Sequence, residues 1–236
     1  MNRLSYMDQN FEEINARIRG AEARVGREGV RLVAAVKYTD AEHINYLHRE
    51  LGVHDVGENR VQQLLEHWET VDREGLNFHF IGKLQTNKVK YIADKVDCIQ
   101  SLDSDRLARE IEKQCAKIGR VMDVLIEINS GNEEAKSGIA PEEVKAFAHR
   151  VVSGEYPHLA LKGFMTMAPK STEEEYRVIF RKTRLMCESL WSELPMADEP
   201  MVMSMGMSES YIPAAAEGAT MVRVGRGLFQ KPDINE

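Results

Sequence analysis

A lysine closes an apolar run, residues 31–37, near the start of the chain. We expect a buried strand over residues 32–37 with Lys37 at its end, where partial burial favours the neutral amine. A neutral amine is the nucleophile that forms Schiff bases with aldehydes. A structural role is the alternative, because lysines at strand ends commonly extend the ammonium group into water.

Two segments that contain glycine and serine follow predicted strands near the end of the chain, residues 204–208 and 223–227. Serine hydroxyls and glycine backbone N–H groups can approach an anion closely, as a phosphate site requires. In a closed barrel the last strand lies beside the first, so this phosphate site would neighbour Lys37. The combination predicts a ligand that is both an aldehyde and a phosphate ester, such as the cofactor pyridoxal 5'-phosphate (PLP).

Arg223 bears on the ring of that cofactor. Its neighbours Val222 and Val224 point to the opposite face of the predicted strand, so Arg223 would point into the barrel. There it can face the ring nitrogen, and because arginine stays cationic it would leave that nitrogen unprotonated. A structural salt bridge at the barrel mouth is the alternative.

Four further polar residues lie within or at the ends of predicted strands. Asn59 could hydrogen-bond the phenolic oxygen or the imine region of the cofactor, or it could cap the following helix. Glu58 is more typical of a loop anchor, and His79 of a core histidine with satisfied hydrogen bonds. Glu127 lies inside an apolar run, so its carboxylate must be paired there or serve as a second site residue.

Eight strand-like runs alternate with helical patterns after an N-terminal amphipathic helix. Strict alternation predicts a parallel sheet with right-handed crossovers. A doubly wound sheet would leave two strands unexplained, so we expect an α/β fold with a single (β/α)8 TIM barrel over residues 1–236. The expected strands are residues 32–37, 55–59, 78–82, 98–101, 121–129, 161–167, 201–205 and 221–224. The expected helices between them include residues 40–51, 60–72, 86–93, 104–118, 141–153, 172–194 and 210–217.

Composition argues against several classes of protein. The net charge is −7 with acids and bases interspersed, so no basic surface calls for nucleic acid. No run approaches membrane-spanning length, and the first residues lack the apolar stretch of a signal peptide. Cys98, Cys115 and Cys187 fit reduced thiols, and the histidine spacing does not suit a metal site. We expect a cytoplasmic protein without a metal, and a monomer because no long apolar interface stripe is evident.

These residues resemble the YggS/PROSC type of PLP homeostasis proteins. The likeness extends through most of the chain in seven ordered blocks of sequence. The blocks are residues 34–37, 57–62, 79–88, 136–139, 163–167, 204–208 and 221–225.

The resemblance implies a fold-type III PLP-binding barrel, like the N-terminal domain of alanine racemase. The family's cofactor contacts carry over to Lys37 as the Schiff-base lysine, Asn59 near the cofactor, Arg223 at the ring nitrogen, and Ser204 with the backbone around Gly225 and Arg226 at the phosphate. The family is associated with keeping PLP and other vitamin B6 vitamers in balance, without a robust catalytic reaction. PLP-dependent apo-enzymes are the partners that this role implies.

Two positions depart from the family pattern. Arg226 stands where a small residue, often threonine or serine, is expected beside the phosphate, and Gln230 replaces the glycine that commonly follows Phe229. Arg226 could add charge to the phosphate site or turn outward. Neither departure affects Lys37 or Arg223.

An enzyme is the alternative to a PLP carrier. A racemase needs two proton-transfer groups, one of them the lysine, and we expect no second domain to supply the other because the sequence ends soon after its last strand. A minimal racemase or decarboxylase would use Glu127, His79 or Lys136. A barrel enzyme that joins Lys37 to a sugar aldehyde is a further alternative. We favour a carrier that serves intracellular PLP homeostasis without robust catalysis.

Overall fold

A closed barrel of eight parallel strands forms the centre of the protein, in a computed structural model that describes residues 3–37, 39–131 and 137–231. Each strand pairs with the next along the chain, and β8 pairs with β1 to close the barrel. The strands are β1 (Arg31–Ala35), β2 (Asp55–Glu58), β3 (Asn77–Phe80), β4 (Cys98–Leu102), β5 (Met122–Ile128), β6 (Leu159–Thr166), β7 (Val202–Met205) and β8 (Met221–Val224). The predicted (β/α)8 barrel is confirmed.

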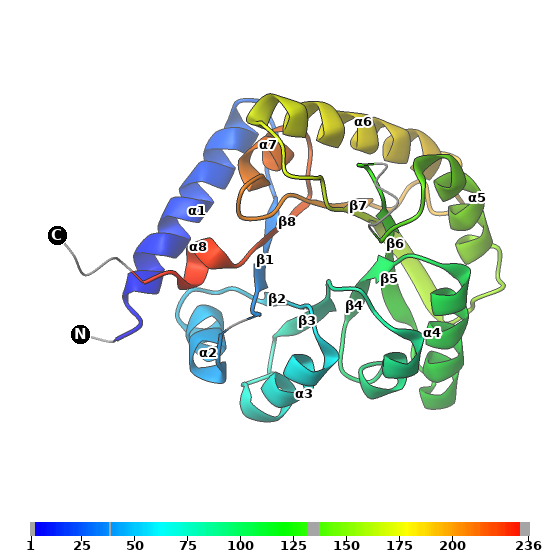
Figure 1. Ribbon diagram of the computed structural model, residues 1–236, viewed down its shortest axis with the longest axis horizontal. Helices are drawn as coiled ribbons and strands as arrows, with labels where there is room; N and C mark the ends of the chain where they lie inside the picture. Colours follow the sequence, from blue (N-terminus) through cyan, green and yellow to red (C-terminus); the bar gives the residue numbers. More distant parts are fainter. Residues whose placement is uncertain (1–2, 38, 132–136, 232–236) are drawn as a thin grey trace.

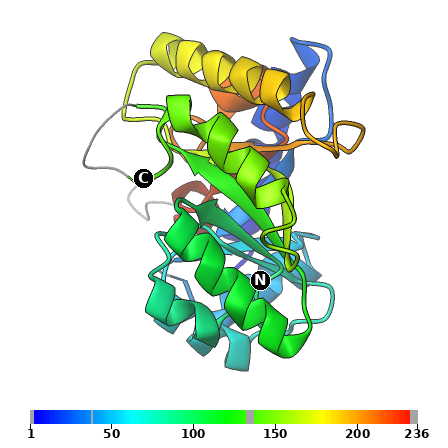
Figure 2. The same ribbon diagram turned by 90° about the vertical axis from the view of Figure 1, so that its right-hand side faces the viewer.

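Helices cover the outside of the barrel (Figure 1). They are α1 (Tyr6–Ala23), α2 (Ala41–Arg49), α3 (Val61–Thr70), α4 (Asp105–Ile118), α5 (Pro141–Val152), α6 (Glu173–Trp191), α7 (Tyr211–Ala216) and α8 (Arg226–Phe229). A 3-10 helix, η1 (Thr86–Tyr91), replaces the α-helix expected between β3 and β4. Figure 2 shows α4, α5 and α6, coloured green to yellow, outside the strands. α1 packs against α7 and α8, beside the point where the barrel closes (Figure 1).

Helices α2 and α4 each begin with a side chain that caps the helix. At the start of α2, Asp40 accepts a hydrogen bond from the backbone N–H of His43 at 3.1 Å. At the start of α4, Ser104 accepts one from the backbone N–H of Leu107 at 3.3 Å. Each bond satisfies an N–H group that the helix itself leaves unpaired. The first cap also fixes the far end of the loop that carries Lys37.

The barrel interior contains more polar groups than the branched apolar layers typical of this fold. Most of the apolar core lies between the strands and the helices. Inside the barrel, a small apolar cluster of Cys98, Leu125 and Met165 is accompanied by buried polar side chains. Those polar residues are Asp55, His79, Gln100, Ser204 and Arg223. None of the described helices has the length and apolar character needed to cross a bilayer.

Candidate functional site

A cavity of about 270 Å³ opens at the C-terminal ends of the strands, the end of a barrel at which active sites form. Loops after several strands contribute its walls. Five of the six predicted cofactor contacts line it, and Ser204 does not. The lining residues are Ala35, Lys37, Asn59, Ile81, Met167, Ala168, Lys170, Tyr176, Met207, Ser208, Glu209, Ser210, Arg223, Gly225 and Arg226.

Lys37 lies in a turn just beyond β1. The turn forms because the backbone N–H of Thr39 donates to the carbonyl of Val36 at 3.2 Å, so the strand ends at Ala35 and not at Lys37. Lys37 is consequently exposed at the rim of the cavity, and the partial burial expected from the sequence is wrong. The residue is therefore accessible to a ligand that enters through the open mouth.

Gly225 brings the loop after β8 against β1. The two strands pair with Ala34 opposite Val224, and a Cβ atom on Gly225 would lie 2.8 Å from the carbonyl oxygen of Ala35. A larger residue would push the strands apart, so glycine is required for this close approach. The loop after β8 and Lys37 therefore lie on the same side of the cavity.

Asn59 faces the cavity with an unfilled hydrogen-bonding position. Its Oδ1 atom is buried and has no hydrogen-bond partner among the described residues. Gly82 permits this placement, because a Cβ atom there would lie 2.2 Å from the carbonyl oxygen of Asn59. A buried amide group without a partner is uncommon in native proteins. The position is suited to a polar group of a ligand.

Arg223 is buried beneath the cavity and points inward, as predicted. Its Nη1 donates to Ser204 Oγ at 2.7 Å and its Nη2 donates to the carbonyl of Thr166 at 2.9 Å. Neither bond goes to a carboxylate, so these contacts do not form the structural salt bridge that was the alternative. Burial lowers the pKa of Arg223 to about 10, and the charge of Glu127 opposes that shift. The guanidinium remains cationic at neutral pH and has further N–H donors for a ligand.

Ser208, and not Ser204, brings a hydroxyl to the cavity. Ser204 is fully buried within β7, and its Oγ donates to Gln100 and accepts from Arg223. The chain turns only at Gly206, where φ is +91° and a Cβ atom would lie 2.5 Å from the Cβ of Ala214. Ser208 therefore lies beyond the turn, where its Oγ accepts from the backbone N–H of Gly225 at 3.4 Å. The sequence pattern contains both serines, but it does not show where the strand ends.

The side chain of Arg226 turns outward. It is 72% exposed and pairs with Glu209, with 2.6 Å between Nη2 and Oε1. The hydrogen bond from Arg226 lowers the pKa of the Glu209 carboxyl. The backbone of Arg226 begins α8 directly after Gly225. The backbone thus remains at the cavity while the charged group lies at its solvent-exposed rim.

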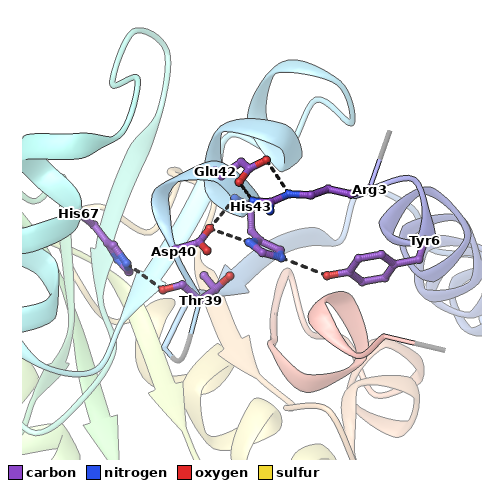
Figure 3. A network of polar contacts seen from close by, with 7 residues as sticks. All are labelled: Arg3, Tyr6, Thr39, Asp40, Glu42, His43 and His67. Carbon is purple, nitrogen blue, oxygen red and sulfur yellow. Dashed lines mark hydrogen bonds and ion pairs between the residues drawn. The ribbon is translucent and has the colours of Figure 1, made fainter. Parts of the chain in front are cut away.

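Glu58 anchors the loop that carries Lys37, as its position suggested. Its carboxylate is fully buried and hydrogen-bonds His67 Nδ1. The other ring nitrogen of His67 lies 3.1 Å from the carbonyl oxygen of Thr39, as Figure 3 shows. Burial raises the pKa of Glu58, and the contact with His67 opposes the shift. The Glu58–His67 pair therefore fixes the turn after β1 through the contact of His67 with Thr39.

A second set of contacts attaches α1 to the same loop (Figure 3). His43 Nδ1 lies 2.6 Å from Asp40 Oδ1, and His43 Nε2 lies 3.1 Å from the hydroxyl of Tyr6. Arg3 pairs with Glu42 at the surface. Since Tyr6 belongs to α1 and Asp40 caps α2, the loop after β1 is fixed from both sides.

The residues considered for a second proton-transfer group do not meet in this cavity. Glu127 is buried, and its Oε1 accepts from Ser137 at 2.8 Å. His79 is a core histidine that bonds Asp55 and Gln100. Neither lines the cavity, and Lys136 lies outside the described residues. No group of three or more His, Cys, Asp or Glu side chains in the described ranges could hold a metal ion.

Comparisons of the sequence give a consistent family. Residues 9–231 match the family described as "Alanine racemase, N-terminal domain". A curated pyridoxal phosphate homeostasis protein from Aquifex aeolicus is 40% identical over 224 residues, which cover 94% of this chain and 96% of the relative. Another, from Pasteurella multocida, is 33% identical over 235 residues, with 98% and 99% covered.

Solved structures with the same fold include members close in length. An unknown protein from Bifidobacterium adolescentis has a TM-score of 0.85 and 32% identity, with 96% of both chains covered. PipY from Synechococcus elongatus, solved with PLP bound, has a TM-score of 0.77 and 28% identity, covering 91% of this chain and 98% of PipY. Alanine racemase from Clostridium difficile has a TM-score of 0.72 over 96% of this chain and 58% of its own length, and its 15% identity supports the fold alone.

Proposed function

The chain belongs to the family of pyridoxal phosphate homeostasis proteins, and we propose that its barrel-mouth cavity holds PLP through a Schiff base on Lys37. One observation carries the proposal. An accessible lysine, a cationic arginine and an amide with an unfilled hydrogen-bonding position line one cavity, as Lys37, Arg223 and Asn59. The function is PLP homeostasis, in which the protein holds the cofactor and releases it.

The cavity offers a partner for each part of the cofactor. Lys37 provides the amine that condenses with an aldehyde and releases water. Arg223 would donate an N–H group to the ring nitrogen, and the Oδ1 atom of Asn59 would accept a hydrogen bond from the phenolic O–H or from the N–H of the imine region.

The phosphate would lie against the loop after β8. Ser208 and the backbone N–H groups of Gly225 and Arg226 surround the place it would take. When bound, PLP supplies an aldehyde that forms imines reversibly and a ring that withdraws electrons.

The site favours retention of the cofactor over its use in catalysis. A cationic arginine at the ring nitrogen excludes a proton there, and this weakens the ring as an electron acceptor. Neither Glu127 nor His79 lines the cavity to act as the second proton-transfer group of a minimal racemase or decarboxylase. We therefore propose a carrier without robust catalysis.

The partners follow from the same site. Other B6 vitamers that carry the phosphate could bind the Ser208 side of the cavity without the lysine bond, and PLP-dependent apo-enzymes are the proposed recipients of the cofactor. A monomer and a cytoplasmic location remain proposals drawn from the sequence.

Titration with chosen aldehydes tests the function. The purified protein is mixed with PLP, with glyceraldehyde 3-phosphate, or with pyridoxine 5'-phosphate, which lacks the aldehyde, and binding is followed by absorption and calorimetry. We expect a yellow complex with PLP and weaker, reversible binding of pyridoxine 5'-phosphate. A protein that stays colourless with PLP but binds the sugar phosphate would contradict the carrier and support the sugar-aldehyde enzyme.

A further inference from the structure

Five buried polar side chains form a continuous chain of hydrogen bonds through the barrel. Arg223 Nη1 donates to Ser204 Oγ at 2.7 Å, and the Ser204 hydroxyl donates to Gln100 Oε1 at 2.7 Å. Gln100 Nε2 lies 3.1 Å from His79 Nδ1, and His79 Nε2 lies 2.9 Å from Asp55 Oδ1. The five residues come from five different strands, β2, β3, β4, β7 and β8. The chain therefore crosses the whole interior.

The two ends of this chain lie in two cavities. Arg223 lines the cavity at the mouth. Asp55 and His79 line a second cavity of about 270 Å³ at the opposite end, formed where the strands begin. The chain of hydrogen bonds thus joins the floor of the barrel to the proposed cofactor site.

Packing alone does not explain these residues. Gln100 and Ser204 are completely buried, and polar groups in that position are costly unless every hydrogen bond is made. Branched apolar side chains fill the same layers in a typical barrel. The second N–H of Gln100 is also engaged, since Nε2 donates to the sulfur of Met221 at 3.1 Å. Gln100 and Ser204, at the centre of the chain, are thus paired on both sides, and their contacts fix the orientation of Arg223.

The donors and acceptors of the chain all run in one direction. Gln100 Oε1 accepts from Ser204, so its amide nitrogen faces His79 and donates to Nδ1. His79 Nδ1 must then carry no proton, and its Nε2–H donates to Asp55. Only the neutral Nε2–H form of His79 satisfies both contacts.

A second proton on His79 would break this order. Its Nδ1–H would face the amide N–H of Gln100, donor against donor, and the amide would have to turn over. Ser204 would then receive donors from both Gln100 and Arg223, and its own hydroxyl hydrogen would lose its acceptor. The hydrogen bonds that His79 makes therefore determine those of Ser204, the residue that holds Arg223.

Charged groups surround His79 at the floor. Burial opposes ionisation of Asp55, but the hydrogen bond from His79 and the charge of Arg31 keep its pKa below the usual value. Burial raises the pKa of Asp123 and of Cys98. The groups that face His79 across this cavity are Arg31 from β1, Asp55 from β2, Asp97 before β4, Cys98 from β4, Asp123 from β5 and Lys162 from β6.

We propose that His79 is a positioning residue for the cofactor: through Gln100 and Ser204 it holds the guanidinium of Arg223 in the orientation that meets the cofactor ring. The inference rests on the proposed function, because it takes Arg223 to contact PLP. Loss of the hydrogen bonds of His79 at the floor of the barrel would therefore weaken the hold on the cofactor at its mouth, although the two ends share no ligand.

Nitrogen NMR of the cofactor-free protein tests the chain by itself. The signals of His79 are assigned by their loss in His79→Gln. We expect the neutral Nε2–H tautomer at neutral pH, and a Nδ1–H tautomer or an imidazolium there would overturn the inference. Since no PLP is present, this result is independent of whether the proposed function is correct.

A matched pair of variants tests the link to the cofactor. Gln100→Leu removes the centre of the chain, whereas Ser101→Ala removes the adjacent buried hydroxyl, which has no hydrogen-bond partner within the described part of the chain. We expect Gln100→Leu to weaken PLP binding about tenfold, the equivalent of about one hydrogen bond, and to shift the absorption of the bound cofactor. Ser101→Ala should change neither. Wild-type affinity and spectrum in a folded Gln100→Leu protein would contradict the proposal.

His79→Gln provides a second test that does not depend on the folding of Gln100→Leu. Its amide oxygen can accept from Gln100 and its N–H can donate to Asp55, so it preserves both hydrogen bonds of His79. We expect near-normal PLP affinity at neutral pH in this variant. His79→Leu, whose side chain can neither accept from Gln100 nor donate to Asp55, should instead weaken PLP binding about as much as Gln100→Leu. Equal PLP affinities of His79→Gln and a folded His79→Leu protein would overturn the proposal.

Discussion

The two ends of the barrel hold cavities of equal volume, about 270 Å³, yet their polar groups are satisfied to different degrees. At the floor, Asp55 lies 2.9 Å from His79 Nε2, accepts from Asn77 at 3.2 Å and lies 3.9 Å from Arg31. At the mouth, the buried Oδ1 of Asn59 has no partner among the residues described. Both ends of the barrel are polar. The mouth differs from the floor in the unfilled hydrogen-bonding position of Asn59, which is suited to a ligand.

Among the substitutions considered, Lys37→Ala is expected to have the largest effect on PLP binding at the mouth of the barrel. The yellow complex with PLP should be lost completely, because no other residue is proposed to form the Schiff base. Since Lys37 is exposed beyond β1, the melting temperature should stay at the wild-type value. Lys170→Ala, at the same cavity, is the control and should remain yellow. Absorption spectra of the wild type and the two variants after addition of PLP show which of them form the yellow complex.

Substitution of Ser204, within β7, and of Ser208, beyond its end, should affect different properties: protein stability in the first case and PLP binding in the second. Ser208→Ala removes one hydrogen bond to the phosphate and should weaken PLP retention by about 1.5–3 kcal/mol without changing the stability of the free protein. Ser204→Ala leaves Arg223 and Gln100 without their shared partner, so it should lower the free energy of unfolding by about 1–3 kcal/mol even without PLP. Calorimetry and denaturant unfolding measure the two effects. The reverse pattern would move the phosphate to Ser204.

Acidification should lower the free energy of unfolding through Asp55, at the floor of the barrel. The folded-state pKa of Asp55 is lowered: burial opposes its ionisation, but the hydrogen bond from His79 outweighs that effect together with further contacts. Its contribution to stability is therefore present above the unfolded pKa of about 3.9 and is lost as the pH falls through the folded value. Asp55→Asn should flatten the fall in unfolding free energy below about pH 4. An unchanged acid profile in this variant would mean that Asp55 does not stabilise the floor.

Arg226→Thr is expected to have the smallest effect. The substitution places a small residue where the family pattern expects one, and it removes only an exposed ion pair with Glu209. The melting temperature and the PLP dissociation constant should both stay close to their wild-type values. A large loss of PLP affinity would show instead that the Arg226 side chain reaches the phosphate.

Sequence patterns predict some parts of this site better than others. The alternation around Arg223 predicts its inward direction, because side chains in a strand alternate between faces. The end of β7 is not predictable to one residue, and for that reason Ser204 was expected where Ser208 lies. The turn after Val36 likewise exposes Lys37.

The hydrogen-bond chain through the barrel could not be predicted from the sequence. Gln100 has no distinguishing pattern around it, and its partners, His79 and Ser204, lie 21 and 104 residues away along the chain. Such contacts depend on which strands neighbour one another and on how far each residue lies along its strand. The order of strands follows from the alternation of elements, but the register does not.

Reduction with borohydride followed by peptide mapping shows which lysine forms the Schiff base with PLP. The wild-type protein is loaded with PLP, reduced, digested and analysed by mass spectrometry. We expect a phosphopyridoxyl group on Lys37 and an unmodified Lys170, although both lysines line the same cavity. Modification of Lys170 in preference to Lys37, or no modification at all, would contradict the assignment of the mouth of the barrel as a PLP site built around Lys37.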